Sequence, residues 1–413
     1  MMPWGLRLPS GIPRNALPFL LVSLINATGS AFMWPLITIY VHNVLHQNYA
    51  AAGFVLLLQS SAGVIGQMVG GSLYHRVGPR WLISGSLMIQ AVAQLGLIVA
   101  RTWWPYVLMM TANGFLFAIT MPAVNAFIGF RWKEERRRLF TIVYVFNNMG
   151  VAIGTSLAGL LASVSFSLTF LFNGLSTFLF AVFFLIYVRR VGERSESDAV
   201  TGETIAQAPA TTRTLLGQYR VYILMTIGAL FIWFATSCWN SGIAPYLNQR
   251  GQGVLGYSWL WTINGVLIVV MQPLISWFNR AWGQSLVRRL VVGTLLYMVA
   301  FGWMWRAHGL YLDLVIGMVI GTLGEMLVNP TVPALVTETT GRSAPFYLGL
   351  VGGVSNAGRL IGPPLFGFLF DSFGVSPILL IAALAAVISA ISFQCHGMLN
   401  ARVAAKAGQV TEG

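Results

Sequence analysis

The sequence predicts an all-α integral membrane protein of twelve transmembrane helices, arranged as two pseudo-symmetric six-helix bundles. Three observations support this fold class: the composition, the number of long apolar runs and an internal repeat. Of the 413 residues, 56% are hydrophobic and 8% are charged, and the mean hydropathy is +0.74. Soluble domains carry about 25% charged residues, so this composition cannot cover a surface that faces water.

Twelve apolar runs are each long enough to cross a bilayer core, which needs roughly 20 residues per helix. The alternating pattern of membrane barrel strands is missing from them. The first run contains Asn26, Trp34 and Pro35 and is too long for a cleavable signal peptide. The runs span 16–41, 48–73, 81–100, 104–130, 138–163, 165–188, 219–247, 254–279, 285–306, 309–337, 344–370 and 375–398.

Basic residues set the predicted orientation. With the N-terminus in the cytoplasm, the inner segments hold 20 of the 24 Lys and Arg residues, whereas the outer loops hold only Arg101, Arg250 and Arg306. Cytoplasmic loops carry such an excess of positive charge. We therefore expect a multi-pass protein of the cell membrane with both termini in the cytoplasm.

Residues 189–215 interrupt the apolar pattern and contain four of the eleven acids. This polar composition is typical of a flexible linker, which we expect in the cytoplasm. It divides the chain into an N-terminal bundle, residues 1–188, and a C-terminal bundle, residues 216–413.

An internal repeat supports this division. The fifth run reads NMGVAIGTSLAG and the eleventh reads NAGRLIGPPLFG, with Asn and three Gly residues in register at an offset of 208. Parallel six-helix repeats are a common plan among transporters, which bind substrate between the repeats. Glycine alone could also serve close helix packing. The matched residues are Asn148, Gly150, Gly154 and Gly159 in the first half and Asn356, Gly358, Gly362 and Gly367 in the second.

The loop after the second run reads GSLYHRVGPR, residues 71–80. It resembles the G-x-x-x-D-R-x-G-R-R signature of the major facilitator superfamily, the twelve-helix secondary transporters. His75 stands where the family has an Asp that contributes to closing the cytoplasmic side, so this sequence lacks that acidic group. The resemblance implies a role in gating for Gly71, His75, Arg76, Gly78, Arg80, Gly150, Gly154, Gly159, Gly358 and Gly362.

The fifth run also looks like the motif G-x-x-x-G-P-x-x-G-G of the proton-driven drug antiporters. In this sequence Thr155 replaces the Pro of the motif, and Ala158 replaces one of its Gly residues. Met110 lies about where these antiporters have an Arg used in proton coupling. The resemblance to this branch implies multidrug efflux, proton-coupled, by alternating access. The alternatives are an exporter or flippase of an anionic amphiphile or lipid-linked molecule, and a nutrient symporter.

Glu325 is the one acid near the middle of an apolar run, and Arg359 is the one base so placed. Because charge in the membrane is costly, such residues are candidates for function. They could pair as a neutralised structural contact. Alternatively, Glu325 exchanges a proton with a cationic substrate while Arg359 supports it or binds an anionic group. We assign both to proton coupling.

The resemblance further implies that the first, fourth, seventh and tenth helices line a central cavity. Aromatic faces beside one acid suit lipophilic cations. Polar and aromatic side chains can instead join helices or anchor at the interface. The candidate cavity residues are Asn26, Trp34, Tyr40, Asn113, Asn125, Trp233, Trp239, Asn240, Tyr246 and Asn329.

Other function classes are disfavoured. The sequence has no phosphate-binding G-x-x-x-x-G-K-[ST] loop, which argues against an ATP-driven pump. An intramembrane enzyme would need paired acids, or His with Ser, deep in the runs. His42 and His46 have helical spacing without a third ligand, so we expect no metal site and no cofactor. The expected partners are a small-molecule substrate, protons and membrane lipids but no nucleic acid, and the expected state is a monomer.

Overall fold

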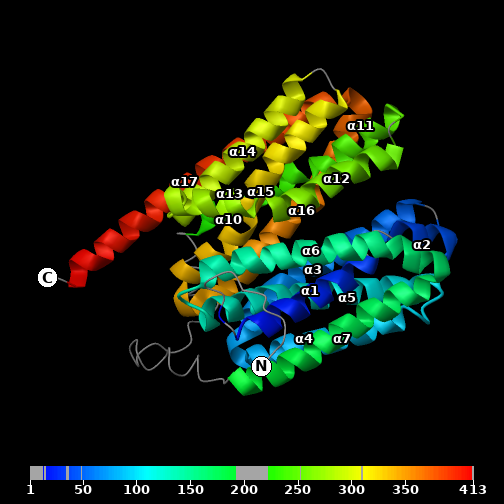
Figure 1. Cartoon of the computed structure of the whole chain (residues 1–413), viewed down its shortest axis with the longest axis horizontal. Helices are drawn as coiled ribbons and strands as arrows, with labels where there is room; N and C mark the ends of the chain where they lie inside the picture. The colour runs from blue at the N-terminus through cyan, green and yellow to red at the C-terminus, as the bar shows by residue number, and fades with distance from the viewer. Residues whose placement is uncertain are drawn as a thin grey trace.

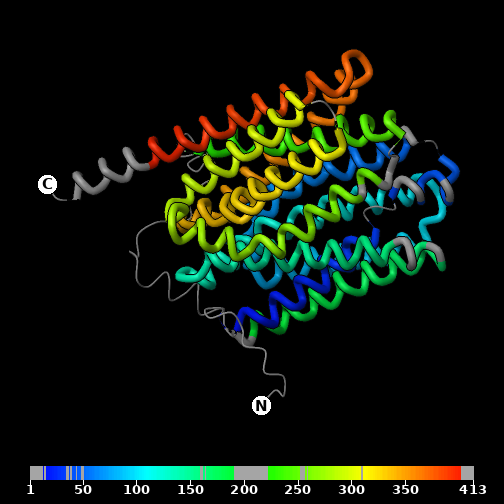
Figure 2. Tube along the Cα trace, turned by 45° about the horizontal axis from the view of Figure 1, so that its top comes forward, coloured from blue at the N-terminus to red at the C-terminus, as the bar shows by residue number. Residues whose placement is uncertain are grey.

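The computed structural model describes residues 13, 15–33, 37–47, 49–191, 222–251, 253–307 and 310–411, and within these ranges it contains helices and no strand. Figure 1 shows two groups of helices side by side, one from each half of the chain. Figure 2 shows that the helices of both groups run roughly along one common axis. Most of the expected linker, from residue 192 on, lies outside the described residues.

The N-terminal bundle consists of α1 (Leu17–Met33), α2 (Ile37–Asn43), α3 (Tyr49–Val77), α4 (Pro79–Gly96), α5 (Trp103–Arg131), α6 (Arg136–Val164) and α7 (Phe166–Val191). The C-terminal bundle consists of α10 (Ile223–Thr236), the π-helix η3 (Trp239–Ile243), α11 (Ala244–Gln249), α12 (Gly253–Val270), α13 (Gln272–Ala281), α14 (Leu286–Arg306), α15 (Tyr311–Thr339), the short η4 (Gly341–Ser343), α16 (Ala344–Phe373) and α17 (Val375–Thr411).

Each of the twelve predicted runs coincides with one helix or with one broken helix. By length and composition, 8 described helices can cross a membrane, or 9 when the pair α12 and α13, bent by 54°, is one span. The remaining runs correspond to α1 with α2, to α4 and to α16. The all-α membrane fold is thus confirmed, and most predicted ends agree within a few residues.

Two of the three repeat glycines in each half make the same contact in both bundles. A Cβ atom on Gly150 of α6 would lie 2.7 Å from the Leu24 carbonyl oxygen of α1, and one on Gly358 of α16 would lie 2.5 Å from the Leu230 carbonyl oxygen of α10. Only glycine permits such close approach of two helix backbones. One turn further along, the same helix pairs are in contact at Gly154 and Gly362.

The two bundles meet mainly through α3 and α5 with α16, and through α6 with α12 and α15. Gly71 of α3 allows the backbones of Pro345 and Gly349 in α16 to come close. This contact lies at the end of the molecule that carries the loops after α3, α5, α13 and α15, which we call the basic end. At the other end, α2 and α11 lie well apart in Figure 1.

Candidate functional site

Glu325 lies near the middle of α15, and two amide side chains donate to its carboxylate. The Asn264 Nδ2 atom of α12 donates to Oε2 at 2.9 Å, and Asn329 Nδ2, one turn along α15, donates to Oε1 at 3.2 Å. Asn264 also donates to the Thr322 hydroxyl at 3.0 Å. Both carboxylate oxygens are therefore hydrogen-bonded, which lowers the cost of a charge at this depth.

Proline shapes this part of α15. Pro330 directly follows Asn329 inside the helix. Because proline has no N–H, it leaves the carbonyl of Met326 without the usual helical donor. The backbone of α15 therefore has one free carbonyl within the turn that follows Glu325.

A residue of the other bundle faces the same carboxyl group. Tyr144 of α6 packs on the apolar side chains of Ile268, Met326 and Leu327. Its hydroxyl is buried and interacts with the Glu325 carboxyl and with the Asn329 side chain, at positions outside strict hydrogen-bond geometry. Glu325 therefore lies at the seam between the bundles.

Arg359 lies near the middle of α16 and does not bond directly to Glu325. Its guanidinium carbon is 3.6 Å from the ring centroid of Trp233 on α10, a cation–π contact. Among the described residues, the ion pairs within 4.0 Å both involve Glu338 rather than Glu325. The structure thus keeps the two deep charges as separate groups that interact only at longer range.

Two candidate cavity residues instead hold helices together. Asn113 is buried, and its Oδ1 accepts from Gln90 at 3.1 Å and from Gln94 at 3.0 Å, which joins α5 to α4. Tyr40 is buried in an aromatic cluster, with its ring centroid 5.1 Å from that of Tyr106. Both contacts are typical of helix packing in membranes.

Three other candidates surround the break in the seventh span. Trp239 is buried at the start of η3, and Asn240 accepts a 2.6 Å hydrogen bond from the Tyr257 hydroxyl of α12. The Arg250 guanidinium lies 4.9 Å from the ring of Tyr246. These contacts fix the irregular backbone between α10 and α11.

The remaining candidates are less defined by their contacts. The side-chain oxygen of Asn26 is buried without a hydrogen-bond partner among the described residues, and Asn125 is half-buried. Trp34 lies outside the described residues. Of the predicted set, the structure brings Asn329 to Glu325 and Trp233 to Arg359.

The basic end is closed by a cluster that the sequence analysis did not identify. Arg137 of α6 donates to both carboxylate oxygens of Glu338 on α15, each at 2.6 Å, and also to the Gln284 carbonyl at 2.9 Å. Arg136 adds an ion pair with Glu338 at 3.3 Å. The signal in the sequence was Glu338, a lone acid at the inner end of the tenth run, together with the basic loop at 131–138.

The predicted gating motif also lies at this end. His75 Nε2 is 2.5 Å from the carbonyl oxygen of Arg342, which precedes α16 in the other bundle. Gly78 has φ of 81° and begins α4, a conformation that favours glycine. Of the two motif arginines, Arg76 is exposed and Arg80 is half-buried beside Trp81.

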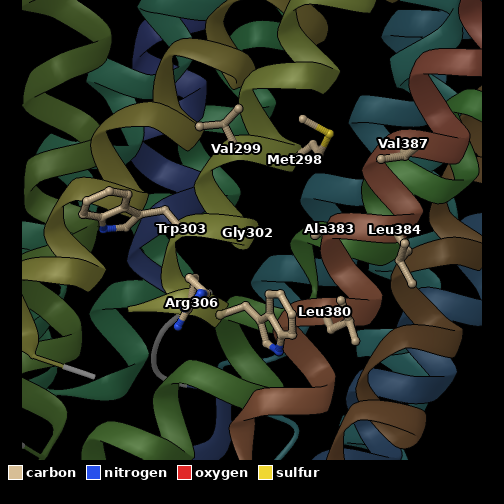
Figure 3. Close-up of a pocket in the computed structure, with 10 residues that line it drawn as sticks. Met298, Val299, Gly302, Trp303, Arg306, Leu380, Ala383, Leu384 and Val387 are labelled. Atoms are coloured by element: carbon tan, nitrogen blue, oxygen red, sulfur yellow. The ribbon is translucent and has the colours of Figure 1, made fainter. Parts of the chain in front are cut away.

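An apolar groove of about 520 Å³ lies elsewhere, between α14 and α17 (Figure 3). Several of its side chains are exposed, as expected of a surface covered by lipid acyl chains. Glu325 and its hydrogen-bond partners are not part of the lining, so the groove is distinct from the candidate site. Its lining consists of Met298, Val299, Gly302, Trp303, Trp305, Arg306, Leu380, Ala383, Leu384 and Val387.

Comparison with known proteins agrees with this architecture. The family model of the Major Facilitator Superfamily matches residues 19–344 and 225–405. YttB of Bacillus subtilis (strain 168), an uncharacterized MFS-type transporter, is 35% identical over 375 residues, which cover 89% of this chain and 91% of YttB.

More distant relatives carry functional names. The class H tetracycline resistance protein of Pasteurella multocida is 22% identical over 87% of this chain and 89% of its own length. The quinolone resistance protein NorA of Staphylococcus aureus (strain N315) is 21% identical over 85% of this chain and 88% of its own length. The human organic anion transporter MFSD10 (TETRAN) has a similar fold, with a TM-score of 0.70 at 12% identity, covering 92% of this chain and 100% of that one. The chain therefore belongs to the major facilitator superfamily, and it is a multi-pass membrane transporter rather than an enzyme.

Proposed function

We propose that this protein is a proton-coupled exporter of lipophilic, often cationic compounds, working by alternating access in the cell membrane. The observation that carries the proposal is Glu325, a carboxylate in the middle of a span, held by Asn264 and Asn329 at the seam between the bundles. A deep acid with polar partners marks a proton or substrate pathway in a membrane protein.

The hydrogen bonds at Glu325 differ between its two protonation states. The ionised carboxylate accepts from both amides, whereas the protonated acid has its own O–H to donate and offers fewer acceptor sites. Protonation therefore changes the contacts that this group makes with α12 and with Tyr144 of the other bundle. Protonation of this one group is thereby coupled to the contacts between the bundles, and such coupling is the requirement for exchange of a proton for substrate.

The closed basic end defines the state of the transporter. We assign this end to the cytoplasm because its loops hold most of the positive charge. Arg137 and Glu338 join the bundles there, as does the contact of His75 with the Arg342 carbonyl. Access in this state is thus expected from the outer side, where protons load Glu325 as substrate leaves.

The names of the distant relatives support export of drug-like compounds. One confers tetracycline resistance and one quinolone resistance, and both align with most of this chain. From these names we propose only the class of substrate, drug-like lipophilic compounds, and no individual drug.

The test follows a fluorescent lipophilic cation, ethidium, in proteoliposomes under an imposed pH gradient. Wild type should accumulate ethidium when the gradient is present. Glu325→Gln should lose that accumulation, by about a hundred-fold, and keep ethidium exchange at equal pH. The matched control is Asp313→Asn, which changes an acid at the end of the same helix and should leave both activities unchanged. Indifference of wild type to the gradient, or normal accumulation by Glu325→Gln, would contradict the proposal.

A further inference from the structure

Arg359 is a positive charge in the middle of a membrane span that no carboxylate neutralises directly. Among the described residues, its contact is the stacking on Trp233 at 3.6 Å, and no ion pair includes it. A charge at this depth of the membrane normally acquires a bonded counterion because its removal from bulk water is costly. An anionic group would supply such a counterion.

The side chain points into the protein rather than into lipid. Successive residues of a helix advance by about 100°, so Ile361, Leu365 and Phe368 lie roughly 180–240° from Arg359 around α16. These three apolar side chains are exposed by 54%, 41% and 65%, and they form the lipid-facing side of the helix. Arg359 lies on the opposite side.

Contacts of the neighbouring glycines agree with this direction. Gly352 packs on Gln67 of α3, and Gly362 packs on Phe234 of α10. These two glycines lie about 20° and 60° to either side of Arg359 around the helix, so Arg359 lies between the two contact faces, toward the interior between the bundles. Its side chain is nevertheless exposed, so water or a ligand can reach the guanidinium group from the inside.

Stacking on Trp233 leaves the guanidinium ready to bind an anion. Its five N–H donors lie in the plane of the group, and a ring that stacks on the face blocks none of them. In-plane donors match the two oxygens of a carboxylate, and likewise those of a sulfonate. The indole of Trp233 offers an apolar aromatic surface directly beside this fork.

We propose that Arg359 and Trp233 form a subsite for an acidic group attached to an apolar aromatic body. This proposal rests on the proposed function, because it places the subsite in the same transport pathway as Glu325. An ionised Glu325 and Arg359 carry opposite charges, so the substrate that balances both is an amphoteric compound with one basic and one acidic group. The preferred substrates are therefore lipophilic amphoteric compounds rather than simple cations.

The test compares three probes that share one ring: 1-pyrenebutyrate, 1-pyrenebutanol and 1-pyrenebutylamine. Equilibrium binding to purified protein in lipid nanodiscs is measured by pyrene fluorescence, with partition into empty nanodiscs subtracted. Wild type should bind the butyrate about tenfold more tightly than the butanol, as expected for a charged hydrogen-bonded pair. Arg359→Gln should abolish this preference. The control Arg306→Gln removes an arginine of the lipid-facing groove and should leave it intact.

Two further variants test the subsite if Arg359→Gln does not fold. Arg359→Lys keeps the charge but replaces the planar fork, so the butyrate should bind about threefold more weakly than to wild type. Trp233→Leu should weaken binding of all three probes. Equal binding of butyrate and butanol to wild type, or an unchanged preference in Arg359→Gln and Arg359→Lys, would overturn the subsite.

This experiment is independent of proton coupling because no gradient is present. Glu325→Gln should retain the preference for the butyrate. If wild type shows no preference for the butyrate while Glu325→Gln abolishes gradient-driven transport, the subsite fails and the proposed function stands. If wild type keeps the preference for the butyrate but its transport does not respond to the pH gradient, the subsite stands and the proposed proton coupling fails.

Discussion

The two bundles share one architecture but differ in where they carry charge. In each, glycines of one helix pack against the backbone of another: α6 on α1 in the first bundle and α16 on α10 in the second. At the repeat offset of 208, however, Phe117 and Val151 occupy the positions of Glu325 and Arg359. The N-terminal bundle is therefore apolar at the two places where the C-terminal bundle is charged.

This difference separates the residues that are needed for folding, the repeat glycines, from those that carry the proposed function, Glu325 and Arg359. Contacts that recur in both halves, such as the glycine pairs, are required for the helices to pack at all. Residues that break the repeat have no such requirement, and a charge at mid-membrane persists only where it has a use. The four predictions below test this distinction, from the largest expected effect to the smallest.

Bulky residues at the repeat glycines that contact a partner helix should abolish folding in both bundles. Gly154→Leu and Gly362→Leu would each drive a side chain into the backbone of the partner helix, at Thr28 and at Phe234 with Ser237. We expect loss of monodisperse protein in fluorescence-detected size-exclusion chromatography for both variants.

Gly367→Ala is the control for this prediction because a Cβ atom there meets nothing within 4 Å. It should express at the wild-type level, since alanine also favours helix by about 1 kcal/mol over glycine. Normal expression of either leucine variant would show that the repeat is not a packing requirement.

Moving the acid to the equivalent place in the other bundle should not restore transport. The double variant Glu325→Gln with Phe117→Glu retains one deep carboxylate, but it lacks the amide donors that hold Glu325, since Met121 stands at the repeat position of Asn329. We expect it to show below about 1% of wild-type gradient-driven transport in proteoliposomes. Substantial rescue would mean that the bundles are interchangeable for coupling.

Breaking the contact at the basic end should loosen the closed state without abolishing it. Arg137 is half-exposed, so its pair with Glu338 is worth about 0.5–1 kcal/mol after solvent screening, a two- to five-fold change in equilibrium. Distances between spin labels at Lys133 and Arg280 should show a larger open population in Arg137→Gln. The neighbouring Arg138→Gln is the control, and an equal effect there would exclude a specific role of the pair.

Removing the hydroxyl of Tyr144 should have the smallest effect. Tyr144→Phe keeps the apolar packing on Met326 and Leu327 but takes away the group of the N-terminal bundle that faces Glu325. We expect transport to fall by about two- to five-fold with unchanged thermal stability, as measured in proteoliposomes and by thermal shift. A larger loss in stability than in transport would assign Tyr144 to packing alone.

Much of the fold could be predicted from sequence because membrane spans obey strong local rules. A bilayer demands long apolar helices, and the glycine repeat at 150–159 and 358–367 showed how two halves relate. Breaks inside spans were harder to foresee. The 54° bend at Met271 and the π-helix after Cys238 lie just before Pro273 and Pro245, whose missing N–H groups interrupt the helix, but the sequence does not give the form of each break.

The candidate site was predicted only in part. Glu325 and Arg359 stood out because charge is rare in apolar runs, whereas Asn264 and Tyr144 are ordinary residues for a span. Their contact with Glu325 joins positions more than 60 residues apart, on helices whose rotation the sequence does not give. The same applies to Arg137 and Glu338, which are 201 residues apart.

The sequence by itself determined the membrane class, the two halves and the two deep charges, because these follow from composition, hydropathy and the repeat. Only the tertiary structure decided which partners those charges have. Glu325 is held by amides and faces Tyr144, while Arg359 stacks on Trp233 instead of pairing with the acid. The physical reason is that side-chain partners depend on the rotation and depth of whole helices, which are set by packing between segments far apart in the chain.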